Sequence, residues 1–287
     1  MTYRLSTSAT VASALAAVVW LGVAGPTSLG AQSTPRTADG QPDLSGTWNG
    51  GRGGGGGRDY TPDEAGNVSS LSPFRPCHPG QECRAAVNSE RDSGLEQRVG
   101  GEDYNVPLYK PQYWDRVQNL DVNGNRMDLS SRCYPLGVPR MGAPNKIMQN
   151  RDSVVFLYQR HNRFRVIPTD GRPHDPVRAK DVQWDGEPSG HWEGDTLVIE
   201  SVGFTNESWL AWPGYLHSFD MRVVERVWRE GNTLFWQATV HDPDVLMEPW
   251  EMEPVRRQLN TDPLARLVED PPCDEQDFEH MATRERG

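Results

Sequence analysis

Two separate stretches of the chain repeat one short pattern, which constrains the fold more than any other feature. They read "HWEGDTLVIE" (residues 191–200) and "VWREGNTLFWQA" (residues 227–238). In each, a Trp and then an acid precede Gly with Asp or Asn, and Thr, Leu and an apolar run follow. Gly, Asp and Asn accept the positive φ that a tight hairpin turn requires. Each stretch is therefore predicted to be two antiparallel strands joined by a turn.

The first stretch also holds residues that can carry acid/base chemistry. His191, Glu193 and Asp195 would share one face of a continuous extended strand. A turn at Gly194 breaks this alignment, so Glu193 and Asp195 are predicted to serve the strand connection first. An acid/base site made of these side chains is the alternative.

Other parts of the chain supply more strands, with little helix between them. Apolar runs such as "SVVFLYQ", "FRVIP" and "MRVVERVW" indicate at least five strands between residues 153 and 240. Successive hairpins form an antiparallel meander, and closing the meander into a barrel removes its unpaired edges. "GTW" (residues 46–48) resembles the Gly-x-Trp signature of lipocalins, although a Trp can begin any strand. The predicted fold class is mainly β: an antiparallel meander closing into a lipocalin-like barrel, with an irregular N-terminal region and short helices.

The composition divides the chain into four parts. Residues 1–31 have a basic start, an apolar run shorter than a membrane span and small residues before a cleavage point near Ala31. They are predicted to be a cleaved signal peptide, with an uncleaved anchor as the alternative. The mature protein is thus expected to be periplasmic or secreted, without stable membrane insertion. Residues 32–57 are predicted to form a polar leader, first strand and Gly-rich loop. Residues 58–132 are predicted to be an irregular wrapping segment, and residues 133–287 the barrel core with its tail.

Short helices are expected in two places outside the strands. One begins after Pro111 in "VPLYKPQYWDRVQNL", and the other lies within "EPVRRQLNTDPLARL" in the acidic tail.

The four cysteines are Cys77, Cys83, Cys133 and Cys273. An even number in an exported chain favours disulfides. Cys77 with Cys83 would close one loop, and Cys133 with Cys273 would tie the core to the tail, which stabilises by about 4–5 kcal/mol on the chain-entropy model. A metal site formed by Cys77, His78 and Cys83 is the alternative, although a fourth ligand is lacking.

Several phrases occur together in a fixed order. They are "PDLSGTW", "CYPLGVPR", "TDGRPHDP", "WDGEPSGHWEGDTLVIES", "GYLHS", "ERVWR", "HDPDVLMEPW" and "CDE". In this order they resemble a large, mostly uncharacterised family of secreted proteins from Gram-negative bacteria. The resemblance covers about residues 42–48 and 132–275 and implies an exported protein with a lipocalin-like β fold. It implies no substrate and no catalytic roles.

Three residues are candidates for acid/base chemistry: Glu225, His174 and His217. Alternation along "MRVVERVW" places Glu225 on the face of Val223 and Val227. A carboxylate among aliphatic side chains is either functional or paired with an arginine, such as Arg140 or Arg172. His174 and His217 lie in loops and can carry a proton near neutral pH, although a loop histidine is often incidental.

The candidate ligand-binding residues are charged groups and tryptophans of the barrel region. Arg172 can hold a carboxylate in a two-pronged grip, unless it and Asp170 only complete an Asp-Gly turn. Tryptophans join a large apolar area to one hydrogen-bond donor, so they suit both ligand walls and barrel plugs. The full set of candidates is Arg140, Asp170, Arg172, Trp184, Trp209 and Trp212.

Several classes of function are disfavoured by what the sequence carries. A net charge of −11 without a basic stripe argues against nucleic acid. His174, His191 and His217 lie in separate segments without metal-ligand spacing, so no metal is expected. Neither a G-x-S-x-G elbow nor a G-x-G-x-x-G turn within a βαβ unit occurs, and no cofactor is expected.

The function predicted from these features is binding of an apolar, aromatic or sugar-like small molecule by an exported β-barrel. The alternative is a cofactor-free lyase, isomerase or hydrolase that uses a buried Glu/His acid–base pair, for which Glu225 and His174 are the candidates. A structural envelope protein is the second alternative.

Overall fold

The two glycine turns connect paired strands, as the sequence predicts. The computed structural model describes residues 33–50, 107–122, 127–211 and 214–271. Strand β5 (Glu187–Glu193) turns at Gly194 into β6 (Thr196–Val202), and β7 (Arg222–Glu230) turns at Gly231 into β8 (Thr233–His241). Gly194 has a φ of 59° and Gly231 a φ of 57°. The prediction that Glu193 and Asp195 flank a strand connection is confirmed.

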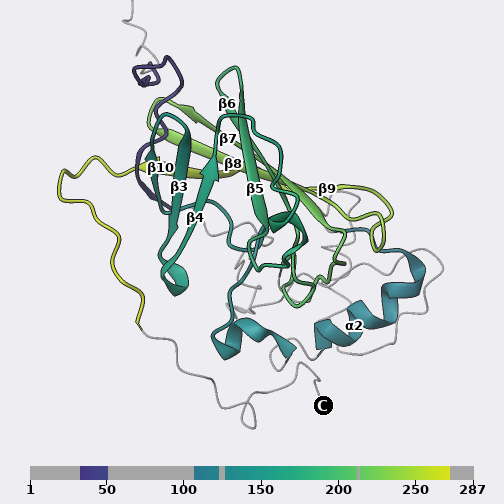
Figure 1. Ribbon diagram of the computed structural model, residues 1–287. Coiled ribbons are helices and arrows are strands. Elements are labelled where there is room, and N and C mark those ends of the chain that lie inside the picture. The colour runs from purple at the N-terminus through teal and green to yellow at the C-terminus, as the bar shows by residue number, and fades with distance from the viewer. Residues whose placement is uncertain (1–32, 51–106, 123–126, 212–213, 272–287) are drawn as a thin grey trace, which may run out of the picture. The chain divides into compact units, whose positions relative to one another are not determined.

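The strands form one antiparallel, barrel-shaped sheet that is nearly closed (Figure 1). Within the described residues the strand order is β4-β3-β2-β1-β10-β8-β7-β6-β5, and β9 pairs beside β8. The mainly β fold class is therefore confirmed. The remaining strands are β1 (Gly46–Asn49), β2 (Lys146–Gln149), β3 (Ser153–Tyr158), β4 (Arg163–Pro168), β9 (Trp250–Glu251) and β10 (Val255–Leu259).

The last strand in the order returns towards the first. The backbone N–H of Gly171, just after β4, donates to the carbonyl of Gly190 on β5 at 2.9 Å. Gly190 also packs tightly here, because a Cβ at this position would lie 2.7 Å from the carbonyl oxygen of Pro168. These contacts hold the two end strands of the sheet close together.

Helices are few and short in the described residues. The helix expected after Pro111 is confirmed as η1 (Pro111–Tyr113) continuing into α2 (Trp114–Val122) (Figure 1). The helix expected in the tail is wrong, because β10 occupies part of that stretch and pairs with β1 and β8. The short helices η2 (Leu129–Arg132), η3 (Arg160–Asn162) and η4 (Arg178–Lys180) lie between strands.

Trp48 of the Gly-x-Trp sequence lies in the core at the start of the barrel. Its ring is covered by the guanidinium of Arg229, 5.2 Å from the ring centroid, and its indole N–H donates to the carbonyl of Leu44 at 3.0 Å. Arg229 in turn donates from Nε to the carbonyl of Gly231 at 2.7 Å. The first strand is thereby joined to the β7–β8 turn.

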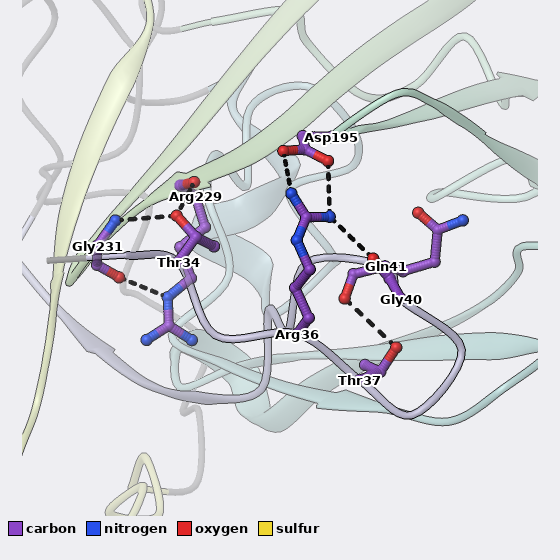
Figure 2. A network of polar contacts seen from close by, with 8 residues as sticks. All are labelled: Thr34, Arg36, Thr37, Gly40, Gln41, Asp195, Arg229 and Gly231. Atoms are coloured by element: carbon purple, nitrogen blue, oxygen red, sulfur yellow. Dashed lines mark hydrogen bonds and ion pairs between the residues drawn. The ribbon is translucent and has the colours of Figure 1, made fainter.

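The segment before β1 lies against both glycine turns (Figure 2). Arg36 forms two parallel hydrogen bonds to Asp195, at 2.9 and 2.7 Å. Thr34 donates to the carbonyl of Arg229 at 3.0 Å and accepts from the N–H of Gly231 at 3.2 Å. Asp195 therefore has a structural partner outside its own hairpin.

Several predictions concern residues that lie outside the described part of the chain. They include the signal peptide, the Gly-rich loop, Cys77, Cys83, Cys273 and Trp212. Cys133 ends η2 with a φ of 67°, and its pairing stays a prediction. None of the helices in the described ranges has the length and apolar character needed to span a bilayer.

Candidate functional site

Glu225 lies inside the barrel, on the inward face that strand alternation predicts. Its side chain is 0% exposed. It accepts two hydrogen bonds from Arg165, at 3.0 and 2.6 Å, and one from the indole N–H of Trp236 at 2.9 Å. The arginine partner is thus Arg165 of β4, and the expectation of Arg140 or Arg172 is wrong.

Two further polar side chains complete this interior network. Arg165 donates to the Ser201 hydroxyl at 3.2 Å and approaches the Tyr158 hydroxyl at 3.4 Å. Burial lowers the pKa of Arg165, but the adjacent carboxylate of Glu225 raises it more, so the guanidinium keeps its proton. Burial also raises the pKa of Tyr158, which stays neutral. With both carboxylate oxygens engaged by a permanent cation, the network has the geometry of a structural ion pair.

His174 does not join Glu225. Its Nε2 lies 3.2 Å from Glu200, which also accepts from Arg222 at 2.7 Å. Glu200 lies opposite Val224, whose side chain takes the face of the sheet away from Glu225. Because the two groups lie on opposite faces of the sheet, the structure does not form the acid–base pair of Glu225 and His174.

Asp170 and Arg172 are engaged with each other in their loop. Arg172 contacts both carboxylate oxygens of Asp170, with its Nη2 at 2.7 Å. The hydrogen bonds from Arg172 lower the pKa of Asp170 to about 2. The Arg172 donors that were expected to bind a ligand carboxylate therefore bind the carboxylate of Asp170.

Other predicted residues gather where loops meet at the barrel. We call them the loop-end cluster, and they come from the segment before β2, the approach to β5 and the loop between β6 and β7. Four of the six are sequence-predicted candidates; Gly137 and Ser208 were not expected. The loop-end cluster comprises Gly137, Arg140, Trp184, Ser208, Trp209 and His217.

A hydrogen-bonded serine and histidine form the buried part of this cluster. Ser208 Oγ lies 2.8 Å from His217 Nε2, and His217 Nδ1 lies 2.8 Å from the carbonyl oxygen of Ser218. A carbonyl only accepts, so Nδ1 carries the ring proton and Nε2 offers its lone pair. The Ser208 hydroxyl must then donate to Nε2. This fixes both the tautomer of the histidine and the direction of the serine O–H.

Asp242 holds Ser218, the residue whose carbonyl orients His217. It accepts from the backbone N–H of Ser218 at 2.6 Å and from its hydroxyl at 2.8 Å. Phe204 packs its ring at 78° to the imidazole, with 6.4 Å between centroids. The His217 ring is thus held by its edge contact with Phe204 and by its hydrogen bond to the Ser218 carbonyl.

Only glycine at position 137 allows the backbone to pass this close to Ser208. Gly137 has a φ of 74°, and a Cβ there would lie 2.8 Å from the carbonyl oxygen of Trp184 and 3.0 Å from Ser208 Oγ. Backbone therefore packs directly between Trp184 and Ser208.

An arginine–tryptophan contact and one aromatic pair surround this backbone. Arg140 lies 5.5 Å from the ring centroid of Trp209 and forms two hydrogen bonds to Asp128, at 2.9 and 2.5 Å. Burial raises the pKa of Asp128, but the bonds from Arg140 lower it more, so the pair stays charged. Tyr134 is 46% exposed, and its ring centroid lies 5.5 Å from that of Trp184. The outer side of the cluster is therefore aromatic and its charges are balanced.

The burial of His217 gives the protein a pH-dependent stability. Burial lowers the pKa of His217, although the Ser218 carbonyl and the charge of Asp242 oppose this. The unfolded chain takes up a proton below about pH 6.5, whereas the native imidazole stays neutral. We expect the stabilisation to be present above pH 6.5 and to be lost as the pH falls through the native pKa, with a slope of up to about 1.4 kcal/mol per pH unit.

Urea unfolding between pH 7.5 and pH 5 checks this against His217→Gln. His161 and His241 also have lowered pKa values because of burial, but they titrate in both proteins and cancel. Parallel stability curves for the two proteins would contradict the assignment.

Within the described ranges, no three His, Cys, Asp or Glu side chains are grouped so that they could hold a metal ion. None of the family models, curated proteins or solved structures compared with the chain matches it.

Proposed function

We propose that the protein binds a small aromatic molecule at the loop-end cluster of its barrel. The observation that carries the proposal is the exposed ring of Tyr134, which tilts by 41° against Trp184 beside the arginine–tryptophan pair. Aromatic rings on a protein surface offer a large apolar area and stacking geometry to a planar ligand. Of the ligand-binding candidates from the sequence, Trp184 is half-buried and contributes to this surface, whereas Trp209 is buried beneath Arg140.

The barrel interior supports the loop end as the place of binding. The inner face carries Glu225 and Trp236 at 0% and 1% exposure, joined to each other by a hydrogen bond. A ligand at that level would have to displace groups that are already paired, which is costly in a low-dielectric interior. The loop end offers partly exposed rings without such a cost.

Balanced charge at the loop end favours a neutral aromatic ligand over an anion. Arg140 is neutralised by Asp128 through two hydrogen bonds and its guanidinium packs over Trp209, so it offers little free charge to a ligand. An organic anion would compete with Asp128 for the same donors. An aromatic ring requires only the stacking faces.

We also infer that the protein acts outside the cytoplasm. The leader pattern of residues 1–31 and the even number of cysteines support this inference. Cell fractionation tests it, and recovery of the protein from the cytoplasm alone would count against it.

The binding proposal predicts a selective effect of Tyr134→Ala. Phenol and indole derivatives should quench tryptophan fluorescence on titration, and the substitution should weaken their affinity about five- to tenfold, which corresponds to one lost stacking contact of about 1–1.5 kcal/mol. Stability should change little, because Tyr134 is about half exposed and its ring contact is with Trp184. Met148→Ala removes a side chain that is 53% exposed on the outer face of β2 and is the matched control. Equal affinities for both variants and the wild type would overturn the site.

A further inference from the structure

We propose that the outer face of the sheet binds a small quaternary ammonium cation, such as choline, against the ring of Trp228. This site lies beside the turns at Gly194 and Gly231, whereas the loop-end cluster is built partly from the loop that joins the other ends of β6 and β7. The two sites share no residue. The inference is therefore independent of the proposed function and adds a second class of ligand.

One row of directly opposite residues crosses five strands on the outer face of the sheet. Trp228 on β7 lies opposite Thr196 on β6 and Phe235 on β8, and the row continues to Glu193 on β5 and Arg256 on β10. Directly opposite residues project from the same face of a sheet. All five are partly or fully exposed, whereas the alternate positions of β7 and β8 are buried. The row is therefore accessible from solvent.

The two rings of this row form a stack that a cation covers at one end. The rings of Trp228 and Phe235 are parallel within 3°, with 5.0 Å between their centroids. The guanidinium of Arg256 lies 5.6 Å from the centroid of Phe235. Within the described ranges no ring or cation covers the opposite face of Trp228, on the side of Thr196. The stack thus binds the chain's own cation at one end and offers a second aromatic face, on the better ring for this contact, at the other.

A carboxylate at the edge of Trp228 favours a cation on its face. The indole N–H donates to Glu230 at 3.2 Å. Among the described residues no arginine, lysine or histidine forms an ion pair with Glu230, so its charge is not balanced locally. A hydrogen bond to a carboxylate polarises the indole and makes its face more negative, which strengthens the attraction for a cation. The net charge of −11 also concentrates cations around the chain.

The residues across from the ring select a quaternary ammonium over a cation with N–H groups. Strands β5 and β7 are two strand spacings apart, about 10 Å, and only the small Thr196 lies between Glu193 and the ring. Glu193 accepts from Arg226 at 2.9 Å, and its other oxygen lies 3.2 Å from His191 Nε2. An N–H ligand would find both oxygens engaged, whereas a quaternary ammonium donates no hydrogen bond. The adjacent turn leaves space, because a Cβ at Gly194 would meet nothing within 4 Å.

Titration with choline, followed by the NMR signals of the tryptophan indole N–H groups, tests the proposal on the wild-type protein. The Trp228 signal is the one that disappears in Trp228→Leu. Choline should shift this signal with a millimolar dissociation constant. The neutral isostere of choline, in which carbon replaces nitrogen, should bind at least about fivefold more weakly, because it lacks the cation–π attraction. Equal affinity for the two compounds, or no shift of the Trp228 signal at tens of millimolar choline, would overturn the proposal.

Variants read from the backbone amide signal of Thr196 locate the site. Trp228→Leu should weaken choline binding at least about fivefold. Glu230→Gln should weaken it about two- to fivefold and leave the neutral isostere unaffected. Phe164→Leu removes a residue that is 63% exposed on β4, outside the row, and is the matched control with wild-type affinity. Wild-type affinity in Trp228→Leu, or an equal loss in Phe164→Leu, contradicts the site. If Trp228→Leu does not fold, Glu230→Gln decides, since it alters only an exposed carboxylate, and unchanged choline affinity there overturns the proposal.

Discussion

Replacing Glu225 by alanine should lower the free energy of unfolding by about 3–5 kcal/mol, the usual cost of removing one partner from a buried ion pair. The change leaves the guanidinium of Arg165 without its carboxylate at a place where its side chain is 3% exposed. The indole N–H of Trp236 loses its acceptor as well. Urea unfolding followed by tryptophan fluorescence at pH 7 measures the loss.

Two further variants show whether the loss comes from the unpaired charge. Glu193→Ala removes a carboxylate that accepts from Arg226 on the solvent-exposed face and should change stability little. The double variant Arg165→Met, Glu225→Leu removes both charges and should recover most of the stability, because apolar groups of similar size replace a buried pair well. A double variant as unstable as Glu225→Ala would show that the unpaired charge does not cause the loss, because Met and Leu remove both charges and fill the volume.

Gly137→Ala should be the second most damaging change, with a loss of about 2–5 kcal/mol. A φ of 74° costs an L-residue about 1–2 kcal/mol, and overpacking adds about 1–3 kcal/mol. The added methyl group would lie 2.8 Å from the backbone carbonyl oxygen of Trp184 and 2.9 Å from the Cβ of Ser208. Neither neighbour is the free end of a flexible side chain. Thermal and urea unfolding measure the effect.

Gly194→Ala separates backbone strain from crowding. Gly194 also has a positive φ, 59°, but a Cβ there would meet nothing within 4 Å. This variant should therefore lose only the strain of about 1–2 kcal/mol. If both variants lose the same stability, Gly137 is required for its dihedral angles alone.

The barrel follows from local sequence because strand pairing and turns have short-range signals. The alternation around Glu225 and the glycine turns at Gly194 and Gly231 are properties of fewer than about ten residues each. The core position of Trp48 also agrees with its place at the start of the first strand. In the tail, residues 255–259 form a strand because β1 and β8 lie on either side and pair with them. Local helix propensity carries no information about these distant strands.

The partner of Glu225 is hidden because β4 reverses the usual pattern. Phe164 is 63% and Val166 53% exposed, whereas the side chain of Arg165 between them is buried. Because apolar side chains usually face the core, the sequence of this strand predicts Phe164 and Val166 inside the barrel and Arg165 outside. Glu225 on β7 determines which way Arg165 points. That contact joins residues 60 positions apart, which a local pattern cannot predict.

Only part of the loop-end cluster could be predicted, since loops have no periodicity. His217 and the tryptophans are noticeable by residue type. Ser208 is an ordinary serine nine positions before His217, in a loop without a nucleophile motif. Its hydrogen bond to His217 and its contact with Gly137 exist only because the fold brings these three residues to the same place.

The strand order has a consequence for how the chain is made. Strand β1 pairs on one side with β2 and on the other with β10, which is about 200 residues further along the chain. A nascent chain emerging from the ribosome cannot complete the ladder around β1 until residue 259 has been synthesised. Closure of the sheet around β1 is therefore a late step, which depends on the most distant strand pair of the barrel.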